Sequence, residues 1–156
     1  MTDALFLLDT NHDNAPVLAA GIEEGWTIAL PSQVKRHAIS AMRLSEGDAL
    51  QLSDGKGLRI HAKVTDVENG LVRVEAFTRE APRTTRLALV QALAKTGHDE
   101  QAIDMATQIG VDEVIPWCAD RSIAKWKPGR ADKRWSQVLQ SATEQSRRAW
   151  MPELQE

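Results

Sequence analysis

The chain has 156 residues, 42% of them hydrophobic and 26% charged, which is ordinary for a soluble globular protein. Its formal net charge of −3 excludes a global positive field of the kind that attracts nucleic acid. The single cysteine, Cys118, cannot form an internal disulfide, and the apolar run 4–8 is too short for a signal peptide or a membrane span. We therefore expect a cytoplasmic protein with no membrane partner.

The first half of the chain consists mainly of short apolar segments, several of which alternate with the two-residue period of β-strands. Strands are predicted at 4–8, 26–30, 49–52, 58–67 and 71–77. A polar loop is expected at 9–15, and a helix at 33–42 with Ser32 as its N-cap. Asn69-Gly70 is a strong signal for a two-residue hairpin turn. Strands this short and this regularly spaced suggest a small barrel.

The pattern changes after residues 81–85, which we interpret as a linker. A short apolar run at 87–93 is typical of a buried strand, and an amphipathic helix follows it and ends at Gly110. Val111 and residues 114–116 supply a second buried strand. Such a strand–helix–strand unit has parallel strands, and ligands of open α/β sheets bind beyond the carboxyl ends of the strands. Lys95 and residues 116–121 occupy those ends.

A last helix is predicted from about residue 131 to 149, with an apolar stripe formed by Trp135, Val138, Leu139, Ala142, Ala149 and Trp150. Only two clear strands follow the linker, which is few for a doubly wound domain. From periodicity alone, we expect this second domain to be incomplete, with apolar sheet surface uncovered near Leu89 and Val114.

Positive charge is concentrated in the segment 121–148, where eight Lys and Arg residues face two acids, a local charge of +6. The default interpretation of such a run is a solvated face. Four of the five tryptophans lie in or beside this segment, and aromatic rings among cations can stack on bases. We expect Trp135 and Trp150 to be core residues, whereas Trp117 and Trp126 are left open.

The sequence contains no common motif for cofactor binding, metal binding or nucleophilic catalysis. Residues 54–57 contain two glycines but lack the spacing of a dinucleotide fingerprint, and a hairpin turn is the better interpretation. The four histidines are scattered and share no metal-ligand spacing with Cys118, so no metal site is predicted. No serine lies in a nucleophile elbow.

An ordered set of short motifs resembles the ribosomal small-subunit RNA methyltransferase E family along nearly the whole chain. In the first half these motifs are His37–Arg43, Glu46–Asp48 and Asp54–Gly57. In the second half they are Gln91–Lys95, Ala106-Thr107, Gly110–Glu113, Ile115–Trp117, Arg121, Arg134-Trp135, Glu144–Arg148 and Pro152-Glu153. The segment Lys95–Asp99 departs from the Lys-Gly-Asp-Arg pattern of the family.

The resemblance implies a mixed fold, α+β or α/β, with a PUA-like RNA-binding β-barrel at 1–81 and the amino-terminal part of a SPOUT (α/β knot) methyltransferase domain at 86–156. Members of that family methylate N3 of a uridine in 16S rRNA of the small ribosomal subunit, use S-adenosylmethionine and form homodimers. The family's Gly-Pro-Glu-Gly-Gly and Leu-Arg-Thr-Glu-Thr segments, which build the knot and the cofactor pocket, are absent here. We therefore expect the cofactor site in a missing carboxy-terminal part, and this chain alone to be inactive.

The resemblance and the local charge together give a set of candidate site residues. RNA contacts are expected from Arg43, His37, Lys95, Arg121, Lys125, Lys127, Arg130, Arg147 and Arg148. Arg148 and Glu144 are candidates for catalysis, although Arg148 is equally interpreted as a helix C-terminal charge favoured by the dipole. The alternative function is a non-catalytic RNA-binding module. A small-molecule α/β enzyme is a third interpretation, but it lacks a nucleophile or cofactor motif.

Overall fold

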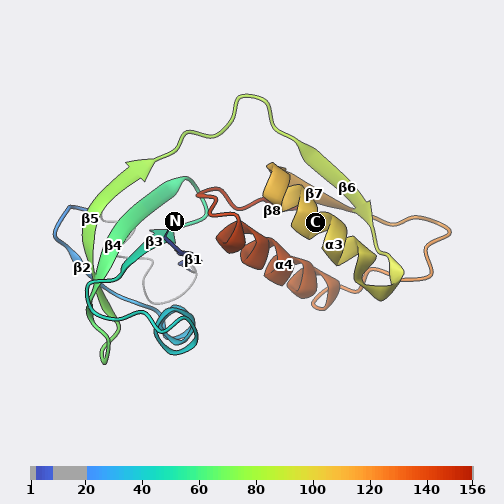
Figure 1. The fold of residues 1–156 in the computed structure, drawn as a ribbon. Helices are drawn as coiled ribbons and strands as arrows, with labels where there is room; N and C mark the ends of the chain where they lie inside the picture. The colour runs from blue at the N-terminus through green and yellow to red at the C-terminus, as the bar shows by residue number, and fades with distance from the viewer. Residues whose placement is uncertain (1–2, 9–20, 156) are drawn as a thin grey trace. The chain divides into compact units, whose positions relative to one another are not determined.

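A computed structural model describes residues 3–8 and 21–155, so the loop predicted at 9–15 lies outside the described residues. The chain divides into two units, Met1–Ala81 and Pro82–Glu156, drawn in Figure 1. Each unit has a hydrophobic core of its own. The division falls where the sequence pattern changes from short strands to a strand–helix–strand unit.

The first unit is a curled five-stranded sheet. Its strands lie in the order β1-β3-β4-β5-β2, with β1 parallel to β3 and the other neighbours antiparallel. The bounds of these strands are β1 (Leu5–Leu7), β2 (Thr27–Ala29), β3 (Ala49–Ser53), β4 (Leu58–Asp66) and β5 (Leu71–Arg79). All five strands therefore correspond to predicted ones.

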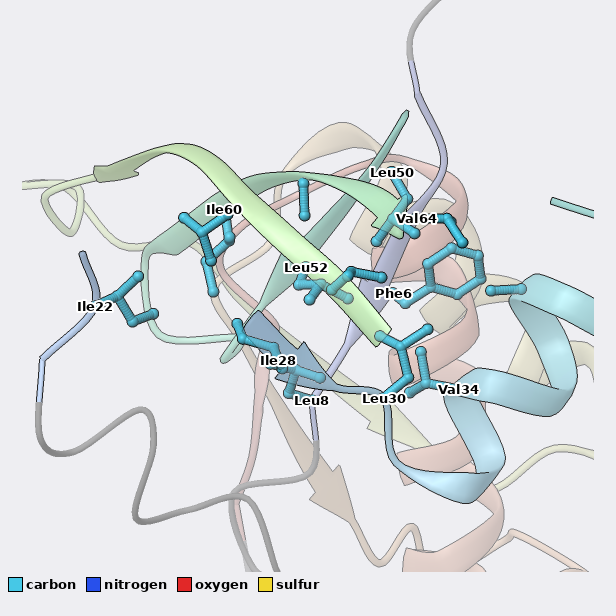
Figure 2. Packing of buried hydrophobic residues seen from close by; sticks show 14 of the residues in the cluster. Phe6, Leu8, Ile22, Ile28, Leu30, Val34, Leu50, Leu52, Ile60 and Val64 are labelled. Carbon is cyan, nitrogen blue, oxygen red and sulfur yellow. The ribbon is translucent and has the colours of Figure 1, made fainter. Parts of the chain in front are cut away.

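Alternate side chains along the two longest strands point inward and form much of the core of this unit. Leu58, Ile60 and Val64 on β4 are buried, as are Val72 and Val74 on β5, which confirms the predicted inward faces. Figure 2 shows apolar side chains from the strands and the helix converging inside the curled sheet. Burial of this apolar surface is the main stabilising contribution to the unit.

The predicted helix at 33–42 forms, but with a different geometry. It begins as α2 (Ser32–Lys35) and continues as a π-helix, η1 (Arg36–Ala41). Ser32 is the first helical residue rather than the N-cap, and Pro31, which precedes it, makes no side-chain capping bond. The wider turn changes the side-chain direction after Ala38, so Met42 follows the helix and is 46% exposed instead of joining the apolar stripe.

The β4–β5 hairpin also differs from the prediction. Asp66 pairs with Leu71, so four residues form the loop instead of two. Gly70 has a φ of +66° and Asn69 has a negative φ, whereas the predicted turn needs both angles positive. The Asp66 carboxylate accepts bonds from the Asn69 backbone and side-chain N–H groups at 2.9 and 2.7 Å, which stabilises the longer loop.

The second unit is a three-stranded parallel sheet with two helices, as expected of a strand–helix–strand unit. The sheet order is β6-β7-β8. The elements are β6 (Ala88–Ala92), a 3-10 turn η2 (Lys95–Gly97), α3 (His98–Ile109), β7 (Glu113–Trp117), α4 (Ala131–Gln145) and β8 (Glu153–Leu154). Gly110, with a φ of +110°, ends α3 at the predicted position.

The prediction for the end of the last helix was wrong, and one strand after it was missed. Helix α4 ends at Gln145, where Arg147 adopts a φ of +54° and the Arg148 N–H bonds back to the Thr143 carbonyl at 3.1 Å. Ala149 and Trp150 therefore lie beyond the helix. The strand β8 was not predicted, because two residues are too few to show a period.

The two faces of this sheet differ in what covers them. Val114 is fully buried and Leu89 packs against the same core, which also contains Ile103 from α3 and Trp135 from α4. Leu89 and Val114 themselves are thus covered, but Leu87 and Val90 on either side of Leu89 are 52% and 57% exposed, so the expectation of uncovered apolar surface near Leu89 is confirmed. Alternation puts Val90 on the opposite face, and its side chain is 57% exposed. No helix in the described ranges is long and apolar enough to cross a membrane.

Candidate functional site

The carboxyl ends of β6 and β7 meet at one edge of the sheet, which we call the carboxyl edge. The two strands are parallel and in register from Ala88 opposite Glu113 to Ala92 opposite Trp117. The turn η2 follows β6, and the segment 118–130 follows β7. Figure 1 shows this segment as an extended loop between β7 and α4. In open α/β sheets this is the edge where ligands bind.

The turn after β6 is tightly wound and presents a cation. Thr96 has a φ of +58° and Gly97 a φ of +79°, so two consecutive residues adopt the left-handed conformation. The Thr96 hydroxyl donates to the Lys95 carbonyl at 2.7 Å. Lys95, a predicted RNA contact, is exposed at this edge.

A serine holds the loop after β7 against the end of β6. The hydroxyl of Ser122 lies 2.8 Å from the carbonyl oxygen of Leu93 and 3.0 Å from that of Ala124. Because Leu93 lies two residues before Lys95, this contact brings the neighbouring Arg121 to the carboxyl edge as well. Arg121 is exposed, as predicted for an RNA contact. No pattern in the sequence predicts the Ser122 contact, which joins residues 29 positions apart.

In the rest of the loop the cationic side chains are exposed, whereas the tryptophan ring is packed. Lys125, Lys127 and Arg130 are exposed, so the structure leaves these predicted RNA contacts accessible. Trp126 is half-buried and packs edge-on against Trp135, with ring centroids 5.1 Å apart and planes at 73°. This settles Trp126 as a core residue.

A buried acid supports the start of both helices beneath this loop. The side chain of Asp99 is fully buried, and its Oδ2 accepts bonds from the Trp135 indole at 2.9 Å and the Arg134 guanidinium at 3.1 Å. Arg134 also pairs with Glu100, with Nε and Oε1 2.6 Å apart. No pattern in the sequence predicts these bonds, because the partners of Asp99 lie 35 and 36 residues away.

Arg148 lies at the opposite edge of the sheet. Its Nη1 donates to the carbonyls of Thr107 and Val111, each at 2.9 Å, at the end of α3 where the chain approaches β7. Burial, with the charge of Arg83 nearby, lowers the pKa of Arg148, and Asp112 acts in the other direction. Arg148 therefore lies away from the carboxyl edge, in the geometry of a cation at a helix C-terminus, and its role as a site residue stays a prediction.

Two other candidates lie close to Arg148 in the sequence. Glu144 is in the last turn of α4, and its carbonyl accepts a bond from the Arg147 N–H at 3.2 Å. Arg147 is half-buried in the turn that ends α4. The structure thus separates Glu144, Arg147 and Arg148 from the cations of the carboxyl edge. RNA contacts of Arg147 and Arg148, and a catalytic role of Glu144 or Arg148, stay predictions.

The first unit carries the remaining two candidates. His37 lies in the π-helix η1, exposed, with its ring edge-on to the buried Phe6 at 5.3 Å and 83°. Arg43 follows the helix with a φ of +57° and is exposed. Within residues 3–8 and 21–155, no group of three His, Cys, Asp or Glu side chains could hold a metal ion.

Both units resemble domains of known proteins. A family model described as an RNA methyltransferase PUA domain matches residues 30–77, and one described as an RNA methyltransferase domain matches residues 80–156. The ribosomal RNA small subunit methyltransferase E of Mycobacterium tuberculosis is 34% identical over 157 residues, covering 97% of this chain and 56% of the relative. The chain belongs to the ribosomal RNA small subunit methyltransferase E family. It spans about half the length of the curated relatives it matches.

Solved structures share the fold at lower identity. A ribosomal RNA small subunit methyltransferase E from Neisseria gonorrhoeae bound to S-adenosyl methionine has a TM-score of 0.78 and 22% identity, covering 99% of this chain and 61% of that one. A putative methyltransferase from Legionella pneumophila in complex with the cofactor SAM has a TM-score of 0.80 and 19% identity, covering 99% and 62%. The curled sheet is thus a PUA-like domain, and the second unit is a methyltransferase domain.

Proposed function

We propose that this protein methylates ribosomal RNA, transferring a methyl group from S-adenosylmethionine to N3 of a uridine in 16S rRNA of the small ribosomal subunit. One observation carries the proposal: a PUA-type and a methyltransferase-type family model match consecutive parts of one chain. Within this proposal, residues 1–81 are the RNA-binding domain and residues 86–156 belong to a SPOUT domain with a knotted fold. The protein acts as a homodimer in the cytoplasm.

The chemistry sets demands on the RNA. N3 lies on the Watson–Crick edge of uracil and carries a proton in the neutral base, so the target must be unpaired and must lose that proton. A cation beside the base stabilises the anionic uracil that forms. Arg121 is our candidate for this role, because it is exposed at the carboxyl edge. Arg148 is a poorer candidate, since its guanidinium is bonded to two carbonyls at the other edge.

RNA affinity is proposed to come mainly from phosphate contacts. Lys95, Arg121 and the exposed cations of the loop 125–130 lie on or after the two strand ends. Long cationic side chains of this kind neutralise phosphates and position RNA without reading its sequence. His37 and Arg43 offer similar contacts in the first unit.

The described residues at the carboxyl edge do not by themselves fit S-adenosylmethionine. An acid that holds ribose hydroxyls has to be presented to the ligand. Asp99, the first acid after β6, is instead fully buried and bonded to Arg134 and Trp135. The hydroxyl of Ser122 is taken up by backbone carbonyls. We therefore assign the cofactor to no residue among those described and derive no step through it.

The proposal is tested in the source organism by deleting the gene and mapping 16S rRNA. A methyl group on N3 blocks Watson–Crick pairing, so reverse transcriptase stops at the modified uridine. Deletion is expected to remove one such stop, and the complete coding sequence is expected to restore it. If all stops persist while the purified protein binds 16S rRNA, the non-catalytic RNA-binding module is the correct function. The exposed cations of the loop 125–130 are the observation that supports this second candidate.

A further inference from the structure

We propose that the indole ring of Trp117 is a stacking platform for an unpaired base of the RNA, an inference that rests on the proposed function. Trp117 is the last residue of β7 and stands opposite Ala92 at the carboxyl edge. Its side chain is 59% exposed. It is therefore a large aromatic surface at the sheet edge where ligands bind in α/β folds.

The direction of the side chain follows from the alternation along β7. Val114 points into the core that α3 and α4 cover. Successive side chains of a strand point to opposite faces, so Trp117, three positions later, lies on the other face. Among the described residues, Trp117 is not part of the buried core, so burial in this core does not account for its position.

The neighbouring tryptophans make the contrast clear. Trp126 and Trp135 pack against each other, and the Trp135 indole N–H donates to Asp99. Both rings therefore have structural roles inside the unit. A tryptophan that stays in water forgoes a large hydrophobic stabilisation, so an exposed one commonly marks a binding surface.

The charge of the segment that follows Trp117 indicates which kind of partner binds its ring. From Trp117 to Arg130 the sequence has four cations and one acid, Asp120, a local charge of +3. The contact of Ser122 with Leu93 holds part of this loop at the end of β6, near Lys95. Val90, on the same face, is 57% exposed and would suit a protein partner. An aromatic ring beside several cations instead matches single-stranded RNA, whose bases stack while its phosphates are neutralised.

This arrangement also suits the reaction. A uridine methylated on N3 has to leave its base pair, and stacking of the released base on another surface offsets part of the cost of unpairing. Stacking on Trp117 would hold the target base, or the base next to it, at the edge where Arg121 lies.

The test measures binding of residues 1–156 to fluorescein-labelled single-stranded oligouridylate by anisotropy at several salt concentrations. Trp117→Ala is expected to lower the affinity about tenfold, and Trp117→Phe to retain most of it, because a phenyl ring still stacks. The slope of log K against log salt should stay unchanged in both variants, because indole carries no charge. Val90→Ala, on the same face, is the matched control and should bind normally.

Each remaining outcome has a defined meaning. Equal affinity of Trp117→Ala and Val90→Ala would overturn the stacking role and leave the proposed function intact. Failure of the unmodified chain to bind any RNA, including 16S rRNA, would count against the proposed function itself. Loss of self-association in sedimentation velocity, with normal RNA affinity, would show that the ring contacts protein. If Trp117→Ala is misfolded by circular dichroism, Trp117→Leu keeps an apolar side chain without an aromatic face and decides the question.

Discussion

Asp99 Oδ2 lies 2.9 Å from the indole nitrogen of Trp135, and both side chains are fully buried. This bond joins the first turn of α3 to the first turns of α4, across 36 residues of sequence. It lies beneath the turn that carries Lys95 and the loop that carries Trp126. The cations of the carboxyl edge are thus supported by a buried polar contact rather than by apolar packing alone.

Replacing Asp99 by Ala should destabilise the second unit by about 1–3 kcal/mol, because the buried indole N–H loses its acceptor. Urea unfolding followed by tryptophan fluorescence measures the change. Glu100→Ala is the control, since it removes the other acid that pairs with Arg134. This ion pair is partly exposed: the side chain of Arg134 is 46% exposed and that of Glu100 is 34% exposed. That change should cost at most about 1 kcal/mol. Equal effects of the two substitutions would contradict the assigned role of Asp99.

Arg148→Ala should destabilise the second unit by about 1.5–3 kcal/mol, because two carbonyls at the end of α3 lose a charged donor. Lys125→Ala, which removes an exposed cation, should leave the free energy of unfolding within about 0.5 kcal/mol of the unmodified value. Unfolding in urea is again the measurement. An Arg148→Ala protein of normal stability but weakened RNA binding would restore Arg148 as an RNA contact.

Gly70→Ala tests the β4–β5 loop in the first unit. A Cβ atom at this position would lie 2.8 Å from Cδ of Lys35, and a φ of +66° strains any L-residue. The backbone strain alone should cost about 1–2 kcal/mol. Gly47→Ala, with a φ of +87° and nothing within 4 Å of its Cβ, reports that strain alone. In a Lys35→Ala background the two glycine substitutions should have equal effects on thermal unfolding, and a persisting difference would argue against the contact.

Reversing the charge of Lys125, Lys127 and Arg130 together should weaken RNA binding and flatten its salt dependence, because fewer counterions are then released. Titration with labelled 16S rRNA fragments at several salt concentrations gives both quantities. The matched control keeps the charge at the same positions, with Lys125→Arg, Lys127→Arg and Arg130→Lys, and should bind normally. If the charge-reversed variant keeps the affinity and the salt slope of the unmodified chain, the loop is an ordinary solvated face.

Isothermal calorimetry with S-adenosylmethionine tests the cofactor assignment. Residues 1–156 are expected to show no saturable binding, because the first acid after β6 is buried and bonded within the unit. Saturable micromolar binding, which corresponds to about −8 kcal/mol, would mean that the described residues hold a cofactor site after all.

Most of the fold was predictable because its signals are local. The alternation of Leu58, Ile60 and Val64 determines which face of β4 is buried, and Gly110 determines where α3 ends. The errors arose where a single side-chain hydrogen bond or an irregular helical turn changed the local backbone geometry. Asp66 extends the hairpin loop by bonding to Asn69, and a π-turn within 36–41 displaces Met42.

The candidate site was predictable only in part. Parallel pairing of β6 and β7 follows from the strand–helix–strand pattern, and it correctly places Lys95 and Trp117 at one edge. The position of Arg148 depends on its bonds to the Thr107 and Val111 carbonyls, which join residues 41 and 37 positions apart and leave no pattern in the sequence. The pairing of Asp99 with Trp135 depends on tertiary packing, which the periodicity of the sequence does not predict.

The loop after β7 is held at one point by the Ser122 hydroxyl and re-enters the fold where the Lys127 carbonyl accepts the Ala131 N–H. Apart from Trp126, which packs against Trp135, the large side chains between these two contacts face solvent, whereas a one-residue shift in the register of β6 would exchange Leu89 for Val90 in the core. Mutation can therefore remodel the charge and length of this loop at little cost in folding, while the strands beneath it stay fixed. In evolutionary terms, the loop proposed to contact RNA is free to diversify separately from the strands and helices that carry it.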